Sequence, residues 1–262
     1  MTTETNILLR HDNNGITTLT LNRPDKFNAL SSELMAAVQS ALDDIAADKS
    51  VRVVIIKGNG KAFSAGHDLQ ELMQDPSEAA MRALFRQCSE MMMSITRLPQ
   101  PVIACVHGVA AAAGCQMVAQ CDLAVAADHV KFGTSGVNLG LFCSTPMVAV
   151  TRNLGRKQAM EMLLTGDLIN AEKALQMGLL NEIVPLAELE QAADELAHRV
   201  ARQSMAAIRL GKELFYKQIE QGLEAAYDMA SEVITCNMQT QDALDGIQAF
   251  LDKQPMPPWK DE

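Results

Sequence analysis

The sequence predicts an α/β protein in which a mainly parallel sheet is followed by a helical region at the C-terminal end. Between residues 16 and 185, short apolar runs alternate with amphipathic stretches. This alternation is typical of parallel strands joined by right-handed helical crossovers. From residue 186 onward, the apolar residues recur only at helical spacing. The length of 262 residues suits one large α/β domain with an appendage.

Four apolar runs predict the strands of the sheet. The run 16–21 alternates apolar and polar side chains and ends at the turn-forming sequence Asn22-Arg23-Pro24-Asp25. The run 51–56 is almost entirely β-branched, which is typical of a strand buried on both faces. The other two predicted strands cover 102–106 and 122–126.

Amphipathic stretches predict helices between and after these strands. Ser32 is predicted to cap a helix that ends near Asp48, because an apolar stripe follows at helical spacing. Asn170 is predicted to cap a helix that ends at Gly178. The other predicted helices cover 75–97, a short stretch after Ala113, 186–203, 205–221, 223–239 and 242–253.

Charge and composition exclude several function classes. The 32 acidic residues outnumber the 22 basic ones and give a formal net charge of −10, which argues against general nucleic-acid binding. No apolar run reaches the ~20 residues needed to cross a bilayer, so we expect no membrane association. The start of the chain, residues 1–10, lacks the features of a signal or transit peptide, and we expect a cytoplasmic protein.

The six cysteines show neither CxxC nor Cys/His metal spacing. Most of them lie in apolar surroundings, which is typical of reduced core residues. We therefore expect neither a disulfide framework nor a metal site.

Two Gly/Ala-rich segments are the most informative feature of the chain. They are Phe63-Ser64-Ala65-Gly66-His67-Asp68-Leu69 and His107-Gly108-Val109-Ala110-Ala111-Ala112-Ala113-Gly114-Cys115-Gln116. Each leads from a predicted strand into a predicted helix. Such junctions present free backbone N–H groups at the positive end of a helix, where an anion or a polarised carbonyl can bind. The two segments together predict an oxyanion hole.

Further motifs occur in a fixed order from residue 21 to residue 179, and with them the chain resembles the enoyl-CoA hydratase/isomerase family, also called the crotonase superfamily. Besides the segment 63–69, the matching motifs are Leu21-Asn22-Arg23-Pro24, Lys26-Phe27-Asn28-Ala29-Leu30, Pro101-Val102-Ile103-Ala104, Cys121-Asp122-Leu123-Ala124, Phe132-Gly133, Leu164-Thr165-Gly166, Ala171-Glu172-Lys173-Ala174 and Gly178-Leu179.

The resemblance implies a crotonase-like spiral of β-β-α turns. It divides the chain into an acyl-CoA-binding core, residues 1–200, and a helical region used in trimerisation, residues 201–262. It also implies an acyl-CoA thioester as ligand, with no cofactor besides the CoA of the substrate, and a lyase or isomerase of fatty acid metabolism. A homotrimer or a dimer of trimers is the implied assembly.

By the same resemblance, the thioester oxygen binds between the backbone N–H groups of His67 and Ala113. Glycine is usual at the second position, and the methyl group of Ala113 crowds the approach and makes a positive φ costly. The alternative is that these small residues only allow a helix to pack closely on the sheet.

Further residues are implied to contact CoA. The backbone of the two loops before the first helices is expected to line the CoA and pantetheine path, and two residues near the C-terminus are expected to form a nucleotide pocket, across a subunit boundary. These residues are Lys26, Ala29, Ala65, Gly66, Asp68 and Leu69 in the loops, and Phe250 and Lys253 near the C-terminus.

The chain departs from the family at both positions of the usual hydratase glutamates, which hold Gln116 and Gly136. An amide orients water but does not usefully accept a proton, and Gly136 has no side chain. Each acid or base contributes about 10²–10⁴-fold, so we expect hydration to be weak or absent. The segment Gly140-Leu141-Phe142-Cys143-Ser144-Thr145-Pro146 resembles that of the enoyl-CoA hydratase domain-containing protein 3 subgroup. Gly136 is further expected to leave room for a bound anion that supplies a carboxylate.

Three side chains near these positions have open roles. The His67 side chain is either catalytic or structural, Cys143 is either a nucleophile or a buried thiol, and Asp68 is expected to order the turn or cap the next helix. The function is therefore open between enolate-forming hydratase or isomerase chemistry, another CoA-thioester reaction such as hydrolysis or decarboxylation, and non-catalytic acyl-CoA binding or regulation.

Overall fold

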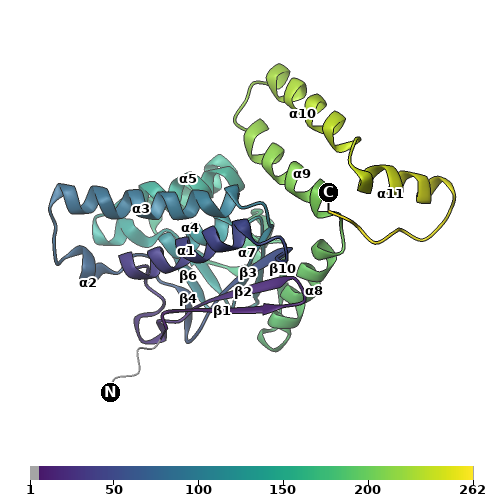
Figure 1. The fold of residues 1–262 in the computed structure, drawn as a ribbon. Coiled ribbons are helices and arrows are strands. Elements are labelled where there is room, and N and C mark those ends of the chain that lie inside the picture. Colours follow the sequence, from purple (N-terminus) through teal and green to yellow (C-terminus); the bar gives the residue numbers. More distant parts are fainter. Residues whose placement is uncertain (1–5, 262) are drawn as a thin grey trace.

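The computed structural model describes residues 6–261 and contains two sheets (Figure 1). Residues 1–5 and Glu262, at the outer ends of the two predicted regions, lie outside the described residues. The larger sheet has the order β1-β2-β3-β5-β7-β10, and only the β1–β2 pair is antiparallel. Its strands are β1 (Leu8–Asn13), β2 (Ile16–Leu21), β3 (Val53–Gly58), β5 (Val102–Val106), β7 (Leu123–Ala127) and β10 (Glu182–Val184).

The smaller sheet has the order β4-β6-β8-β9 and alternates with the larger one along the chain. Each of β3, β5 and β7 is followed by one short strand of the smaller sheet and then by helical structure. This succession is the expected spiral of β-β-α turns, and it confirms the predicted α/β class. The short strands are β4 (Ala62–Ser64), β6 (Val109–Ala111), β8 (Lys131–Gly133) and β9 (Ile169–Asn170).

The central strands are apolar because both of their faces are covered. Every residue of β5 is buried. Helix α8 (Leu189–Ala201) packs on β2, β3, β5 and β7, while α4 (Ala113–Gln120) contacts β4, β5 and β6. Burial on both faces explains why these strands appear in the sequence as continuous apolar runs and not as alternating ones.

Helix α1 (Ser32–Ala47) begins as predicted, but its cap is Ser31 and not Ser32. Ser31 has an extended backbone, and its Oγ accepts the Leu34 N–H at 3.2 Å. The Ser32 N–H is instead bound by the Glu71 carboxylate, at 3.0 Å to Oε2. The predicted stripe of Leu34, Val38, Leu42 and Ile45 is buried, and α1 packs beside α3 (Glu78–Arg97).

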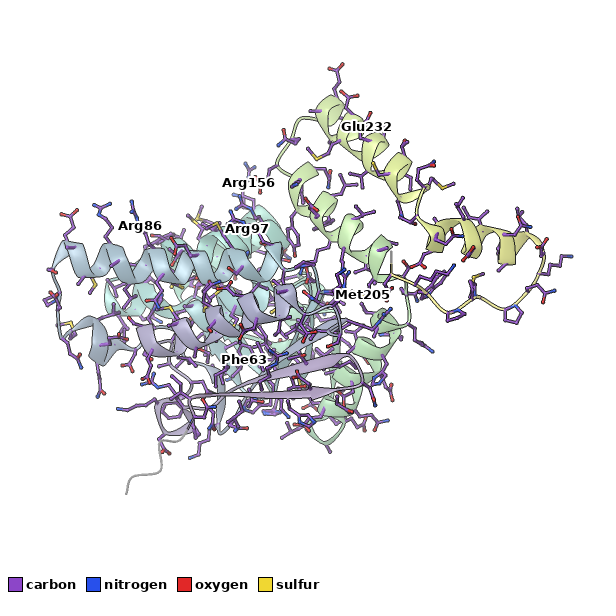
Figure 2. All side chains as sticks on the ribbon, in the orientation of Figure 1. Phe63, Arg86, Arg97, Arg156, Met205 and Glu232 are labelled. Carbon is purple, nitrogen blue, oxygen red and sulfur yellow. The ribbon has the colours of Figure 1, made fainter. Side chains whose placement is uncertain are left out.

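The other helices of the core lie between the strands of the spiral. Asn170 caps α7 through the Lys173 N–H, and Gly178 has a φ of +90°, as the sequence predicts for both ends of this helix. Figure 2 shows Phe63 inside this core and Arg86 extending outward from α3. The remaining core helices are α2 (Leu69–Leu72), α5 (Ser144–Asn153), α6 (Arg156–Thr165), α7 (Ala171–Gln176) and the short 3₁₀ turns η1 (Pro24–Lys26), η2 (Ser135–Leu139) and η3 (Leu186–Glu188).

Three C-terminal helices extend away from the core (Figure 1): α9 (Met205–Gln218), α10 (Leu223–Asn237) and α11 (Gln241–Leu251). A half-buried polar cluster joins α9 to the core, in which Lys212 Nζ and Tyr216 OH donate to Asp122 at 2.6 and 2.8 Å. The predicted boundary after residue 200 falls near the end of α8. Among the described residues, no helix combines the length and the apolar character that crossing a bilayer requires.

Candidate functional site

The two Gly/Ala-rich segments meet in the structure at Gly66. Its φ of +97° lies in the left-handed region that favours glycine. A Cβ built on Gly66 would lie 2.9 Å from the Ala112 Cβ and 3.2 Å from the Ala113 N. The backbone that carries the His67 N–H therefore lies against the backbone that carries the Ala113 N–H.

The His67 N–H is held in place by a short parallel bridge between His67 and Leu30. Leu30 donates its N–H to the Gly66 carbonyl at 2.7 Å, and its carbonyl accepts the Asp68 N–H at 3.2 Å. Ala113 is the first residue of α4, and the N–H groups of a first helical turn have no partner within the helix. Across residues 6–261, neither the His67 N–H nor the Ala113 N–H donates to a protein acceptor. Both donors are therefore available to a ligand.

The positive φ at this junction belongs to Ala112 and not to Ala113. Ala112 has φ +47° and ψ −116°, and its N–H donates to the Gly133 carbonyl at 2.8 Å. Ala113 is already the first residue of α4 and avoids the positive φ that would be costly for an alanine. A non-glycine residue in such a conformation costs about 1–3 kcal/mol.

Helix α4 also packs closely against the segment at Ser64, and this packing depends on Gly114. A Cβ at this position would lie 2.1 Å from the Ser64 carbonyl oxygen. The Ser64 hydroxyl donates to the Asn28 carbonyl at 2.9 Å and accepts the Gly66 N–H at 3.3 Å. The two interpretations of the small residues thus apply to different positions: Gly114 allows the helix to approach, and Ala113 presents a donor.

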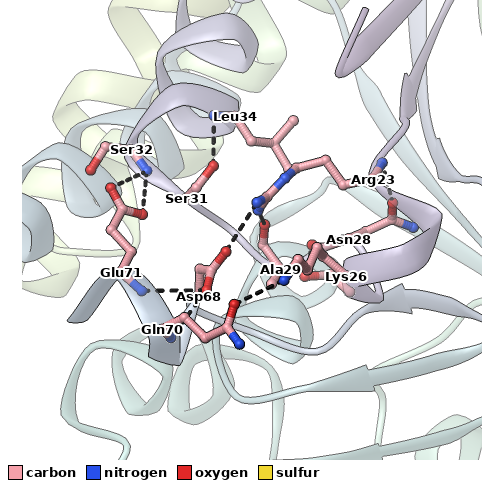
Figure 3. A network of polar contacts seen from close by, with 11 residues as sticks. Arg23, Lys26, Asn28, Ala29, Ser31, Ser32, Leu34, Asp68, Gln70 and Glu71 are labelled. Carbon is pink, nitrogen blue, oxygen red and sulfur yellow. Dashed lines mark hydrogen bonds and ion pairs between the residues drawn. The ribbon is translucent and has the colours of Figure 1, made fainter. Parts of the chain in front are cut away.

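Asp68 orders the turn and caps α2, as the sequence predicts (Figure 3). Its Oδ1 accepts the Gln70 N–H at 3.1 Å, and its Oδ2 pairs with Arg23 Nη2 at 3.0 Å. Burial raises the pKa of Asp68, but the Arg23 hydrogen bond, the Glu71 and Gln70 N–H groups and the Arg23 charge together lower this pKa below its ordinary 3.8. Asp68 is therefore an ionised structural residue and not a proton donor.

Arg23 and Glu71 are site residues that the sequence reasoning missed. Arg23 Nη1 also donates to the Ala29 carbonyl at 2.6 Å, so that one guanidinium connects the loop before α1 to the turn before α2. Glu71 extends from α2 to the N-terminus of α1 (Figure 3). The spacing Asp68-x-x-Glu71 could have indicated the helix start that carries Glu71, because an acidic residue three positions after a cap is typical there, but nothing local indicates its contact with Ser32.

The residues predicted to contact CoA fall into two separate groups. The first group lies in two neighbouring segments, 26–29 and 65–69, and Lys26 Nζ donates to Gln70 Oε1 at 2.8 Å. Its members are Lys26, Ala29, Ala65, Gly66, Asp68 and Leu69. Phe250 and Lys253 lie at the end of α11, on the far side of the molecule from α2 (Figure 1). One chain does not bring the two groups together.

Gln116 lies one turn into α4 and is 4% exposed. Within the described part of the chain, its Oε1 atom is buried and has no hydrogen-bond partner. Buried polar atoms of folded proteins are nearly always paired. The amide oxygen is therefore open to a donor from a ligand or from water.

The position that a side chain on Gly136 would first occupy is filled. A Cβ on Gly136 would lie 2.6 Å from the Leu141 carbonyl oxygen and 2.8 Å from the Cys143 Sγ. The Gly136 N–H donates to the same Sγ at 3.3 Å. The loop 136–143 folds back and places its thiol there, so the room expected for a bound anion is not found at this point. Cys143 is buried, and burial raises the pKa of its thiol despite that hydrogen bond. It is therefore a poor nucleophile.

The His67 imidazole lies edge-on to the ring of Phe85 in α3, with ring centroids 5.3 Å apart. Both ring nitrogens are buried, and neither has a hydrogen-bond partner among residues 6–261. Burial lowers the pKa of the imidazole below its ordinary 6.5, although the Leu30 carbonyl and the Glu71 charge raise it. The ring is therefore neutral at pH 7.

The described residues contain no group of three or more His, Cys, Asp or Glu side chains arranged to hold a metal ion. The functional groups described at this site are two free backbone donors, a buried amide and a buried imidazole.

Comparisons with known proteins agree with this geometry. The family model described as enoyl-CoA hydratase/isomerase matches residues 11–262. The human mitochondrial enoyl-CoA hydratase domain-containing protein 3 is 46% identical over 248 residues, which cover 95% of this chain and 82% of that protein. An enoyl-CoA hydratase structure from Mycobacterium smegmatis superposes with a TM-score of 0.96 at 47% identity, covering 97% of this chain and 99% of the other. The crystal structure of the human protein superposes with a TM-score of 0.93 at 43% identity, over 96% and 100% of the two chains.

The expected cytoplasmic location is contradicted by these relatives. The human, rat and mouse proteins are all named as mitochondrial. The expectation relied on the features of residues 1–10, and reduced cysteines do not distinguish among compartments that keep thiols reduced.

The match along nearly the whole chain and the paired donors at one junction lead to the same result. This chain belongs to the enoyl-CoA hydratase/isomerase family and, within it, to the enoyl-CoA hydratase domain-containing protein 3 subgroup.

Proposed function

We propose that this protein binds an acyl-CoA thioester and stabilises its enolate in an oxyanion hole formed by the backbone N–H groups of His67 and Ala113. Adding water to an enoyl-CoA is expected to be weak or absent in this site. The enolate carries its negative charge on the former carbonyl oxygen, and one preorganised donor of this kind contributes about 3–4 kcal/mol to its stabilisation.

The contact between the two donor segments supports this proposal. A Cβ built on Gly66, the residue before His67, would lie only 3.2 Å from the Ala113 N. Contact this close favours a site in which one oxygen atom binds both N–H groups. Neither group has a protein acceptor in the part of the chain that the structure describes.

Weak hydration is supported by the two positions that hold Gln116 and Gly136. Hydration needs a base to activate water and an acid to protonate the α-carbon. Gln116 supplies neither, and the space next to Gly136 is filled by Cys143 and Leu141. A glutamate introduced at position 136 would require this loop to move.

The exposed apolar side chains of α9–α11 support an assembly of several copies, as a homotrimer or a dimer of trimers. Large apolar side chains remain exposed along these helices, and a groove between α9 and α10 is lined by Phe215, Leu223 and Tyr227. Patches of this kind mark interaction sites. An assembly of this type is also a way to bring Phe250 and Lys253 near the CoA path of another copy.

The proposal is tested by two measurements on one sample. Binding of acetoacetyl-CoA is measured by titration calorimetry, and hydration of crotonyl-CoA is followed at the enoyl absorbance. We expect binding, with hydration at least about 10²-fold slower than an enzyme that has both glutamates, since each group contributes about 10²–10⁴-fold.

Rapid hydration would overturn the argument from Gln116 and Gly136. Absence of CoA-thioester binding would overturn the proposal itself. If the protein binds but turns over no CoA thioester by hydration, hydrolysis, decarboxylation or exchange, a non-catalytic acyl-CoA-binding protein becomes the better description.

A further inference from the structure

We propose that the imidazole of His67 is the group that removes a proton from the α-carbon of the bound thioester. The inference rests on the proposed function, because it requires an acyl-CoA in the oxyanion hole. It assigns the proton transfer to a residue that does not occupy either of the usual glutamate positions.

The imidazole and one of the two proposed oxyanion donors belong to the same residue. His67 supplies one donor of the oxyanion hole from its backbone and carries the imidazole on the same residue. In the proposed site, the ring is thus attached to a residue whose backbone binds the thioester oxygen. A general base must come within hydrogen-bond reach of the carbon acid, either directly or through one water.

The His67 ring packs against Phe85 and lies near the Leu30 carbonyl, but no hydrogen bond among the described residues fixes its nitrogens. Its Nδ1 and Nε2 atoms are buried, and neither has a partner among the described residues. A histidine with a purely structural role normally pairs at least one nitrogen, because an unpaired buried polar atom destabilises the fold. For comparison, the His107 Nε2 atom does have a partner, the Gly60 carbonyl at 3.1 Å.

The other titratable groups of the site already form hydrogen bonds or ion pairs. Asp68 is paired with Arg23, and Glu71 is bound to the Ser32 N–H. The Cys143 thiol accepts the Gly136 N–H. Gln116 and Gly136 carry no titratable group. His67 is thus the one titratable group among these segments that lacks a hydrogen-bond partner in the described structure.

The surroundings of the ring favour a base. Phe85 from α3 and the Leu30 carbonyl lie beside it, and Glu71 from α2 is the charged group that acts on it. Burial lowers the pKa of the imidazole by more than these neighbours raise it. A neutral imidazole has a free nitrogen lone pair at pH 7, as a base requires.

The proposed step is balanced without a co-reactant. The α C–H bond breaks and its proton forms an N–H bond with the unprotonated nitrogen of His67. The electron pair left on the carbon forms the C=C bond of the enolate, while the carbonyl electrons move onto the oxygen between the two N–H donors. In D₂O the imidazolium exchanges its proton for a deuteron, and return of the deuteron gives an α-deuterated thioester.

The experiment measures this exchange with butyryl-CoA in D₂O by mass spectrometry. The variants are H67Q and H67F, because both keep the backbone N–H and neither has a titratable side chain. The matched control is H129Q, which replaces an exposed histidine on the turn between β7 and β8. Thermal unfolding by circular dichroism and acetoacetyl-CoA binding are recorded for every protein.

We expect exchange to fall by at least about 100-fold in H67Q and H67F, with binding of acetoacetyl-CoA retained within about threefold and no change in H129Q. Exchange that persists in a folded H67 variant would overturn the assignment, as would binding without any exchange in the unaltered protein. If the unaltered protein does not bind acetoacetyl-CoA, the proposed function has failed and not the assignment of the base. If H67F is unfolded, H67Q, which keeps a polar side chain, decides.

Discussion

The junction at Gly66 and the loop at Gly136 lie in the same candidate site but differ in what they have kept. At Gly66 the proposed functional groups are backbone N–H groups, and the two segments that carry them are in contact. At Gly136 the functional group would be a side chain, and a thiol and a carbonyl oxygen fill its space.

Backbone donors and catalytic side chains in one site tolerate sequence change differently. A backbone donor survives replacement of its own residue, as long as the turn that aims it is preserved. An acid or base depends on one side chain and disappears with it. A chain of this kind can therefore retain the stabilisation of an oxyanion while losing the chemistry of hydration.

The largest effect is expected where the helix touches the first segment. We expect G114A to lower the free energy of unfolding by about 3 kcal/mol or more, because its Cβ would lie 2.1 Å from the Ser64 carbonyl oxygen. Urea unfolding measures this. The control is G140A, which has a φ of +76° but no atom within 4 Å of a built Cβ, and should cost only about 1 kcal/mol. Equal losses in the two variants would show that α4 does not need this close approach.

The filled space beside Gly136 makes a second prediction. We expect G136A to lower the free energy of unfolding by about 2 kcal/mol, because the new methyl group overlaps the Cys143 Sγ and the Leu141 carbonyl. In a C143A background the same change should cost less, since one of the two contacts is gone. Identical costs with and without the thiol would mean that Cys143 does not occupy this space.

The Asp68–Arg23 pair makes a prediction about pH. D68N keeps a capping side chain but loses the charge, and we expect a loss of about 1 kcal/mol at pH 7. Burial raises the pKa of Asp68 in the folded state, but the hydrogen bonds and the charge of Arg23 lower it by more, so that the net shift is downward. The difference between the two proteins should therefore be full above about pH 5 and disappear as the pH falls through the folded-state pKa. Unfolding at several pH values measures it, and a difference independent of pH would contradict an ionised pair.

The smallest effect is expected at Ala112. We expect A112G to raise the free energy of unfolding by at most about 1 kcal/mol, because relief of the positive φ outweighs the larger entropy of glycine in the unfolded chain. Binding of acetoacetyl-CoA should not weaken, since the Ala113 N–H remains. A destabilised A112G would show that the Ala112 methyl group contributes packing that exceeds its strain.

Sequence reasoning predicted the central strands well because their signal is local. The run 102–106 is apolar throughout, and the structure places β5 at the same residues. The short strands β4, β6 and β8 gave no such signal, since each has only three residues, and β4 and β6 overlap the Gly/Ala-rich segments. Their pairing is supplied by neighbours distant in sequence, such as Ala110 with Phe132.

The site shows the same division. The sequence identified the two segments and the substitutions at Gln116 and Gly136, because these are readable as residue types in order. Arg23 and Glu71 were missed as site residues, since a salt bridge across 45 positions and a carboxylate on a distant helix start leave little local trace.

The order and periodicity of the residues were enough to predict the α/β class and the family, and both are confirmed. The placement of the usual glutamates at Gln116 and Gly136 follows from the resemblance and stays a prediction. The contacts between distant segments came from the tertiary structure alone. Gly66 lies against Ala112, and Cys143 fills the space at Gly136. The nitrogens of the His67 ring have no hydrogen-bond partner among the described residues. Contact between segments depends on how the chain turns at a few backbone angles. Those angles are set by the packing of the whole spiral and not by the residues on either side.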